Sequence, residues 1–408
     1  MLKYLFLFLI LLILQWDDLH AQEVTVLRGL LYTDARAVEI EIRDGIILRI
    51  RDLGEEEESP EVYIAPGLID LQINGYFGVD FSGPDLKEGD LMKATQALWK
   101  VGVTTYFPTL ITSDIQRLHE NFAVLARAKD APEIRAAIPG FHLEGPYISP
   151  LPGFRGAHLG KYIKEPDWKE FKQIQESANH QIKLITVAPE RKGAIPFIEN
   201  CVRNGVLVSI GHHNANPSEI QAAVDAGVRM ATHLGNGCAN EIHRHNNPIW
   251  PQLSQDLLSP TIIADGFHLT REEVRTFFKV KGVDKTILVS DALDLAGLEV
   301  GEYIRGERKL LLTPDVVKLP EENVLAGAAS PISKCVGNMI RFTQCSLGEA
   351  IQMASTNPAR MLSLQDRGEI KVGKRADLIL FRMVDTEMDI RNTYVGGKLV
   401  YSQESDEE

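Results

Sequence analysis

Apolar runs that end in polar side chains recur along the middle of this chain. The stretch from Val206 to Leu234 reads VLVSIGHHNANPSEIQAAVDAGVRMATHL. Two strand-like runs flank one helical pattern, which predicts a βαβ unit. His212 and His233 follow the two runs at equivalent places. We expect both imidazoles at the carboxyl ends of parallel strands, where α/β barrels carry their chemistry.

Six further strand-like segments repeat this alternation between residues 65 and 367, with helix-like segments between most of the strands. Eight strand–helix units predict a (β/α)8, TIM-like barrel. The expected strands are residues 68–74, 103–109, 137–145, 182–190, 206–213, 229–235, 261–266 and 286–292.

The two ends of the chain have a different pattern. Residues 22–64 alternate apolar and polar positions, as in VTVLRGLLYT and AVEIEIRDGIILRIRD, and residues 368–403 do the same. Short alternating runs with DG and GG breaks predict antiparallel strands. We expect both ends to fold together into one small composite β-sandwich, with the barrel of residues 65–367 inserted between them.

Residues 1–21 resemble a secretory signal peptide. Lys3 precedes an apolar run from Tyr4 to Leu14, and a small residue, Ala21, offers a cleavage site. The run is too short for a stable membrane span. We expect export to the periplasm or the exterior if the leader is cleaved. The alternatives are an uncleaved anchor or a mis-assigned start, and the latter implies a cytoplasmic protein.

Composition narrows the class of partner. The 408 residues carry a formal net charge of −13, which argues against broad binding to nucleic acid or to anionic membranes. A small-molecule substrate is expected instead. None of the four cysteines has CxxC spacing, so we expect buried or half-buried thiols and neither a zinc knuckle nor a redox motif.

Polar side chains stand at the ends of most predicted strands. Each alone has an ordinary explanation as a helix cap or a solvated loop residue. Together, a carboxylate, two imidazoles and a second carboxylate on different strands meet at one mouth of a barrel, and N and O ligands of this kind suit a zinc ion with an open position for water. The strand-end residues are Gln72, Asn74, Thr109, His142, Glu144, Glu190, His212, His233, Asp265, His268 and Asp291.

An ordered set of motifs is similar to the N-acetylglucosamine-6-phosphate deacetylases of the amidohydrolase superfamily. The motifs are PGLIDLQING, HLEGPYISP, SIGHHNA, ATHLGN, IADGFH, LVSDA and the late ASTNPARMLSL with GEIKVGKRADLILF. Each motif is weak alone, but the set occurs in the order of that family and covers nearly the whole chain after the leader.

The resemblance implies a barrel of the metal-dependent hydrolase type and a mechanism. Glu144, His212 and His233 would bind one divalent metal ion, Zn²⁺ by expectation, and Asp291 would act as general base and then as general acid. His158 or His268 would help to polarise the carbonyl of the N-acetyl group. The products would be acetate and an amino sugar.

It also implies a substrate site and a homodimer. Gln72 and Asn74 replace an HxH pair that binds a second metal in many relatives, so we expect a single metal with these amides near its bound water. The residues that the resemblance assigns to the sugar are Ala157, His158, Asn236, Gly237, Arg244, Asp265, His268, Leu325, Ala326 and Gly327.

Three features depart from the family pattern. The segment after His233 reads GNGCANEIHRHNNPIW; it keeps Arg244, which reaches the sugar phosphate in the family, often across a dimer interface. The extra histidines and asparagines there indicate either a surface loop or an altered substrate pocket. His213 adjoins His212 and is expected to be structural. The leader conflicts with a phosphorylated substrate, because amino-sugar phosphates are normally intracellular.

Other functions stay open at this point. The substrate could be another N-acyl compound outside the cytoplasm, such as an unphosphorylated N-acetyl amino sugar or an N-acyl amino acid. An N-acyl-D-amino-acid deacylase or a dihydropyrimidinase-like cyclic amidase is disfavoured by the missing HxH. A non-catalytic barrel scaffold is disfavoured because Glu144, His212, His233 and Asp291 are all present.

Overall fold

The computed structural model describes residues 24–403 except 55–56, 306–307, 315 and 322–323. The predicted leader, residues 1–21, lies outside the described residues. Within them, none of the helices has both the length and the apolar character that a membrane span requires.

Eight parallel strands form the barrel, and each lies within or overlaps one of the eight predicted runs. Their order is β14-β13-β12-β11-β10-β9-β8-β5. The ring closes where Asn74 N donates to Ala292 O at 2.8 Å and Asp291 N donates to Gln72 O at 3.0 Å. The predicted barrel is therefore confirmed. The strands are β5 (Leu68–Ile73), β8 (Val103–Ile111), β9 (Phe141–Glu144), β10 (Ile182–Val187), β11 (Leu207–Ile210), β12 (Met230–Ala231), β13 (Ser259–Ile262) and β14 (Ile287–Leu288).

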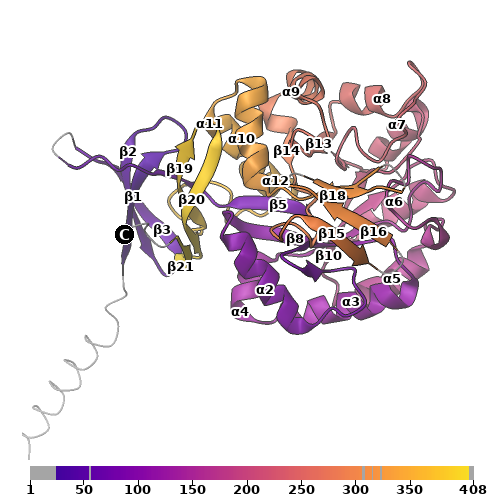
Figure 1. The fold of residues 1–408 in the computed structure, drawn as a ribbon, viewed down its shortest axis with the longest axis horizontal. Coiled ribbons are helices and arrows are strands. Elements are labelled where there is room, and N and C mark those ends of the chain that lie inside the picture. Colours follow the sequence, from indigo (N-terminus) through magenta and orange to yellow (C-terminus); the bar gives the residue numbers. More distant parts are fainter. Residues whose placement is uncertain (1–23, 55–56, 306–307, 315, 322–323, 404–408) are drawn as a thin grey trace, which may run out of the picture.

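Helices cover the outside of the barrel (Figure 1). Several start at caps that the sequence encodes: Asn216 and Glu219 form a capping box at α7, and Thr270 and Glu273 form one at α9. The helices are α2 (Glu88–Trp99), α3 (Ile115–Ala128), α4 (Pro132–Ala137), α5 (Trp168–Ser177), α6 (Ala194–Arg203), α7 (Pro217–Asp225), α8 (Ile249–Ser254), α9 (Arg271–Lys285), α10 (Ile332–Thr343), α11 (Leu347–Ala354) and α12 (Thr356–Met361), with a 3-10 turn at Gly160–Tyr162.

Alternation along the strands divides the barrel core in two. Ile69, Leu71 and Leu184 belong to a cluster built mainly from strand residues and closed by Ala359 of α12. Their neighbours, such as Ile185, belong to the larger cluster that packs the strands against helices, for example through Phe197 of α6. Side chains that alternate across a strand thus serve both the interior and the helical layer.

Strands from both chain ends form one seven-stranded sheet beside the barrel (Figure 1). Its order is β21-β20-β19-β4-β1-β2-β3, so β19 from the late segment pairs directly with β4 from the early one. The predicted composite β-rich unit is confirmed. The strands are β1 (Thr25–Leu31), β2 (Ala37–Arg43), β3 (Ile46–Asp52), β4 (Tyr63–Pro66), β19 (Leu378–Val384), β20 (Glu387–Val395) and β21 (Lys398–Ser402).

A four-stranded antiparallel sheet follows β14, and sequence patterning did not predict it. Its strands are β15 (Gly301–Arg305), β16 (Arg308–Leu312), β17 (Val316–Leu319) and β18 (Val324–Ala328). Leu310, Leu312 and Leu319 pack with Leu295 in a small cluster apart from the main core. A bridge between Ala292 and Ala328 ties β18 to the end of β14. A short hairpin, β6 (Gly75–Tyr76) with β7 (Val79–Asp80), follows β5.

The composite sheet offers a test of its buried face. Ile40 is fully buried in that sheet, whereas Val26 on the neighbouring strand is 49% exposed. Ile40→Ala should lower the free energy of unfolding by about 2–5 kcal/mol, because it deletes buried methyl groups and leaves a cavity. Val26→Ala, the control, should change it by less than about 0.5 kcal/mol. Urea denaturation measures both; equal effects would contradict the assigned faces.

Candidate active site

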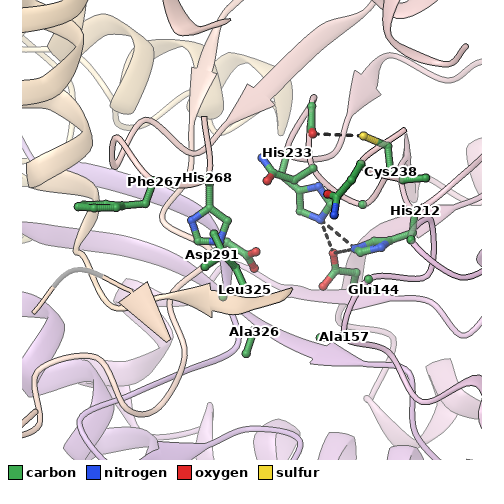
Figure 2. A pocket seen from close by; sticks show the side chains of 18 of the residues that line it. Glu144, Ala157, His212, His233, Cys238, Phe267, His268, Asp291, Leu325 and Ala326 are labelled. Carbon is green, nitrogen blue, oxygen red and sulfur yellow. Dashed lines mark hydrogen bonds and ion pairs between the residues drawn. The ribbon is translucent and has the colours of Figure 1, made fainter. Parts of the chain in front are cut away.

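Three side chains from three strand ends converge at the carboxyl end of the barrel (Figure 2). Glu144 ends β9, His212 follows β11, and His233 follows β12. Glu144 Oε1 lies 3.2 Å from His212 Nε2 and 3.0 Å from His233 Nε2, and the two Nε2 atoms are 3.0 Å apart. All three residues are buried. This cluster is the arrangement of N and O donors that could hold a metal ion.

Unusual backbone geometry accompanies this convergence. His212, His233 and Asp291 all have left-handed backbones, with φ of 51°, 32° and 54°. Non-glycine residues rarely adopt this region, and such conformations concentrate at functional sites. Each of these three residues lies two or three positions after the last residue of a barrel strand. Sequence patterning located the strand ends but gave no sign of this conformation.

The His212 ring is held in one orientation. Its Nδ1 lies 3.0 Å from the carbonyl oxygen of Phe154, so Nδ1 donates a hydrogen and Nε2 keeps its lone pair for the cluster. Gly156 and Gly237 pack against the ring: a Cβ there would lie 2.9 Å from His212 Cε1 and 2.8 Å from Nδ1, respectively. Only glycine allows this close packing at either position.

The charge state of Glu144 favours a cation. Burial alone would raise the pKa of its carboxyl, but the adjoining imidazoles of His212 and His233 outweigh burial and hold the pKa well below its usual value. A buried carboxylate that faces two imidazole nitrogens, one with its lone pair fixed on the cluster, needs positive charge among them. The donor set therefore fits a divalent metal ion.

Asp291 lies beside the cluster and is held by two amides. Its Oδ1 accepts hydrogen bonds from Asn74 Nδ2 at 2.6 Å and from Gln72 Nε2 at 3.0 Å. Gln72 Nε2 also donates to Glu144 Oε1 at 2.9 Å. Burial and the nearby Glu144 carboxylate raise the pKa of Asp291 to about 6. A carboxyl that titrates close to neutral pH suits a group that both accepts and returns a proton.

The amides of Gln72 and Asn74 present their N–H groups, not their oxygens, to the two carboxylates. An N–H group cannot bind a metal ion. This arrangement leaves one group of metal donors in the described residues, Glu144 with His212 and His233. The single-metal expectation drawn from the missing HxH stays a prediction.

A cavity of about 530 Å³ opens above the cluster. Most of the residues that the sequence assigned to the site line it, together with side chains from several loops (Figure 2). The predicted residues in its wall are Asn74, Glu144, Ala157, His212, His233, Asn236, Gly237, His268, Asp291, Leu325, Ala326 and Gly327.

Three predicted residues stand behind the wall of the cavity. Gln72 joins the two carboxylates, as described above. Asp265 accepts a hydrogen bond from His268 Nδ1 at 2.7 Å and so orients that imidazole. His158 is buried with Nε2 3.9 Å from Glu144 Oε2 and Nδ1 2.8 Å from Thr112 Oγ1. Burial lowers the pKa of His158 to about 3, so its imidazole is neutral.

Other predicted residues lie outside the cavity wall. Arg244 sits in an exposed loop, where its carbonyl oxygen accepts a hydrogen bond from Trp250 Nε1 at 2.9 Å. His213 lies outside the metal-ligand cluster, with Nδ1 accepting a hydrogen bond from Ala215 N at 3.2 Å. His142 and Glu190, which also end predicted strands, take no part in the cluster. All four cysteines are free thiols, three of them buried.

Sequence reasoning missed part of the cavity wall. Phe267, half-exposed at the cavity, stands inside the quoted IADGFH motif, so the motif itself could have indicated it. Glu273, Cys238 and Leu293 also line the cavity. These come from a helix N-terminus and from loops, whose folded paths no pattern in the sequence reports.

Comparison with known proteins agrees with the geometry. Residues 63–400 match the family described as the amidohydrolase family. The chain is similar to N-acetylglucosamine-6-phosphate deacetylase of Bos taurus, with 31% identity over 363 residues that cover 86% of each protein. It is also 30% identical to the Bacillus subtilis enzyme of that name, over 84% of this chain and 86% of the relative.

Solved structures show the same likeness in three dimensions. The structure of N-acetylglucosamine-6-phosphate deacetylase from Thermotoga maritima has a TM-score of 0.82 and 30% identity, and the match covers 93% of this chain and all of that one. The enzyme of the same name from Pasteurella multocida gives 0.83 and 27%. The chain belongs to the amidohydrolase family and, within it, to the N-acetylglucosamine-6-phosphate deacetylases, as its motifs predicted.

Proposed function

We propose that this chain hydrolyses the N-acetyl group of an amino sugar, N-acetylglucosamine 6-phosphate, to give glucosamine 6-phosphate and acetate. One observation carries the proposal. A carboxylate held by two amides, Asp291, stands beside a buried cluster of one carboxylate and two imidazoles, and both face one cavity. The names of the relatives supply the substrate.

The cluster is proposed to hold one divalent metal ion. Glu144, His212 and His233 would be its ligands, and two nitrogens with one oxygen favour Zn²⁺ among the common divalent metals. When bound, such an ion polarises a carbonyl group and lowers the pKa of water.

Proton transfer is assigned to Asp291. Its Oδ1 is occupied by the amides of Gln72 and Asn74, which leaves Oδ2 to take a proton from the attacking water. The same oxygen then returns the proton to the departing amine. The two amides hold the carboxylate in place throughout, so no reorganisation is needed between the steps.

The sugar would contact the cavity wall around the cluster. Asn236 Nδ2 lines the cavity region, is buried, and has no hydrogen-bond partner among the described residues, so it can donate to a sugar hydroxyl. His268, oriented by Asp265, is positioned for a second polar contact. Ala157, Gly237 and the Leu325–Gly327 segment would supply backbone groups and close packing.

The phosphate group of the proposed substrate needs a cation beside it. The described residues that line the cavity of one chain do not supply one. The charged side chains in that wall are Glu144, Glu273 and Asp291, with no lysine or arginine among the described lining residues. We therefore propose a homodimer in which the exposed Arg244 of one subunit serves the cavity of the other. The family resemblance supports this assignment.

A second candidate, a deacylase of an unphosphorylated N-acyl compound, is favoured by the same acidic wall. It also fits the leader expected at residues 1–21. We propose export on the basis of that leader, and amino-sugar phosphates are normally intracellular. Amino-terminal sequencing of the protein recovered from its cell of origin tests export. A non-catalytic scaffold is disfavoured because the set of donors and the neighbouring Asp291 are complete.

Asp291→Asn should abolish proton transfer while leaving the metal ligands intact. We expect kcat for acetate release to fall by about 10²–10⁴-fold, the range for removal of general acid–base catalysis. Metal content, measured by elemental analysis, should stay unchanged. Turnover close to that of the unmodified enzyme would contradict the role of Asp291.

Removal of the metal should abolish activity. Dialysis against a chelator should release about one metal ion per chain and eliminate acetate release, because the three ligands form a single site. Adding Zn²⁺ should restore activity in the unmodified enzyme but not in Glu144→Gln, whose neutral amide binds zinc poorly. Full activity in the metal-free protein would exclude the proposed chemistry.

Arg244→Ala separates the phosphorylated from the unphosphorylated substrate. The variant should raise KM for N-acetylglucosamine 6-phosphate by about 10-fold or more, since a charge-assisted contact to phosphate is lost. KM for N-acetylglucosamine should not change. Arg203→Ala, at the exposed end of α6, is the control. Equal KM values for the variant and the unmodified enzyme on the phosphorylated substrate would contradict the dimer proposal, as would a monomer in light scattering.

A further inference from the structure

A second cavity adjoins the first on the side of the inserted sheet. Its volume is about 620 Å³. Both cavities share five lining residues, so they meet along one boundary beside the catalytic side chains. The shared residues are Asn74, Ile111, Ala157, Leu293 and Ala326. Figure 2 shows Ala157 and Ala326 below Glu144 and Asp291, at this boundary.

The wall of the second cavity is mainly apolar. Ile304, Leu310 and Leu319 come from the β15–β18 sheet, and Leu86 and Leu159 come from loops on the other side. Ile304 is 82% exposed and Leu159 is 38% exposed, so both apolar side chains are accessible to an apolar ligand.

The charged residues in this wall are all acidic. They are Asp80, Asp85 and Asp90, and no lysine or arginine occurs among the described residues that line the cavity. A phosphate or carboxylate would meet no cation among these described lining residues. The chemistry of the wall fits an uncharged, apolar group.

The side-chain amide of Asn74, at the boundary between the two cavities, has a defined orientation. Its Nδ2 must face Asp291, because the opposite orientation would put an amide oxygen against the carboxylate. This leaves Asn74 Oδ1, in a side chain of a residue only 6% exposed, without a hydrogen-bond partner in the described part of the chain. An unpaired buried acceptor is costly, so it points to a ligand that donates an N–H or O–H there.

The scissile amide of the proposed substrate supplies such a donor. Its N–H can bond to Asn74 Oδ1, close to the carboxylate of Asp291 that would protonate the nitrogen. A secondary amide is trans, so its two substituents extend in opposite directions from the C–N bond. With the sugar in the first, polar cavity, the acyl group points across the boundary formed by Ala157, Leu293 and Ala326.

We propose that the second cavity is an acyl-chain site, and that this enzyme hydrolyses amino sugars whose N-acyl chains are longer than acetyl. The proposal rests on the proposed function and extends its substrate class. In the reaction, water adds its oxygen to the acyl carbon, the C–N bond breaks, and the amine takes its proton from Asp291. The products are a fatty carboxylate and the amino sugar.

A chain-length series tests the proposal on the metal-loaded enzyme. Glucosamine 6-phosphate and glucosamine are each N-acylated with acetyl, butyryl, hexanoyl and succinyl groups, and amine release gives kcat/KM. We expect butyryl and hexanoyl compounds to match or exceed the acetyl compound. The succinyl compound should be at least about tenfold poorer than butyryl, because its carboxylate meets the aspartates.

Two substitutions block the cavity away from the metal cluster. Ser113→Trp fills it from the loop after β8, and Leu159→Glu adds a further negative charge. Each should lower kcat/KM for the hexanoyl compound by about tenfold or more and change that for the acetyl compound by less than about threefold. Ser59→Trp, the same exchange on an exposed loop of the composite sheet, should change neither. Thermal melting confirms that each variant is folded.

The outcomes are distinct. If the unmodified enzyme releases acetate but not hexanoate, or if the two blocking variants impair both substrates equally, the acyl-chain site is wrong while the proposed function stands. Alkyl glycosides of the N-acetyl compounds, which carry the alkyl group on the anomeric oxygen, are assayed alongside. If Ser113→Trp excludes these glycosides and not the hexanoyl compound, the cavity binds the anomeric substituent and the proposal fails. Absence of amine release from every compound, acetyl included, overturns the proposed function itself.

Discussion

Three electron-rich atoms crowded into a buried space are the constraint on which this site depends. Glu144 Oε1 and the Nε2 atoms of His212 and His233 lie 3.0–3.2 Å from one another, so a proton or a metal cation must lie between them. The Phe154 carbonyl fixes one imidazole with its lone pair toward the cluster. The left-handed backbones at both histidines and the glycines packed on His212 maintain the crowding. The site is arranged to bind a cation.

The barrel provides the rigidity that this crowding requires. Ligands that lie far apart along the chain come from parallel strands whose ends meet at one mouth. Gln72, on the strand that closes the ring, links the metal-ligand carboxylate to Asp291 through a single amide. The same closing contact, Asp291 N to Gln72 O, is part of the barrel itself. The contact that closes the barrel therefore also positions the catalytic carboxylate of Asp291.

Much of this could be predicted from the sequence, because periodicity and strand-end chemistry are local signals. The runs ending at His212 and His233 identified their strands even though only two residues of β12 are paired as strand. The composite sheet followed from alternation at both chain ends. The β15–β18 sheet did not, since its small cluster around Leu310 and Leu319 has no long amphipathic pattern. The cavity walls also escaped prediction: Glu273 and Leu293 reach them through loop and helix paths that depend on tertiary contacts. Arg244 was predicted to bind substrate from the motif match, yet it does not line the cavity of its own chain.

The central claim is that one metal ion binds among Glu144, His212 and His233 and that Gln72 and Asn74 bind none. Anomalous scattering from crystals of the metal-loaded protein, collected on either side of the zinc absorption edge, tests it most directly. The account predicts a single peak at about 2 Å from Glu144 Oε, His212 Nε2 and His233 Nε2. A second peak beside Gln72 and Asn74, or no peak among the three ligands, would contradict it.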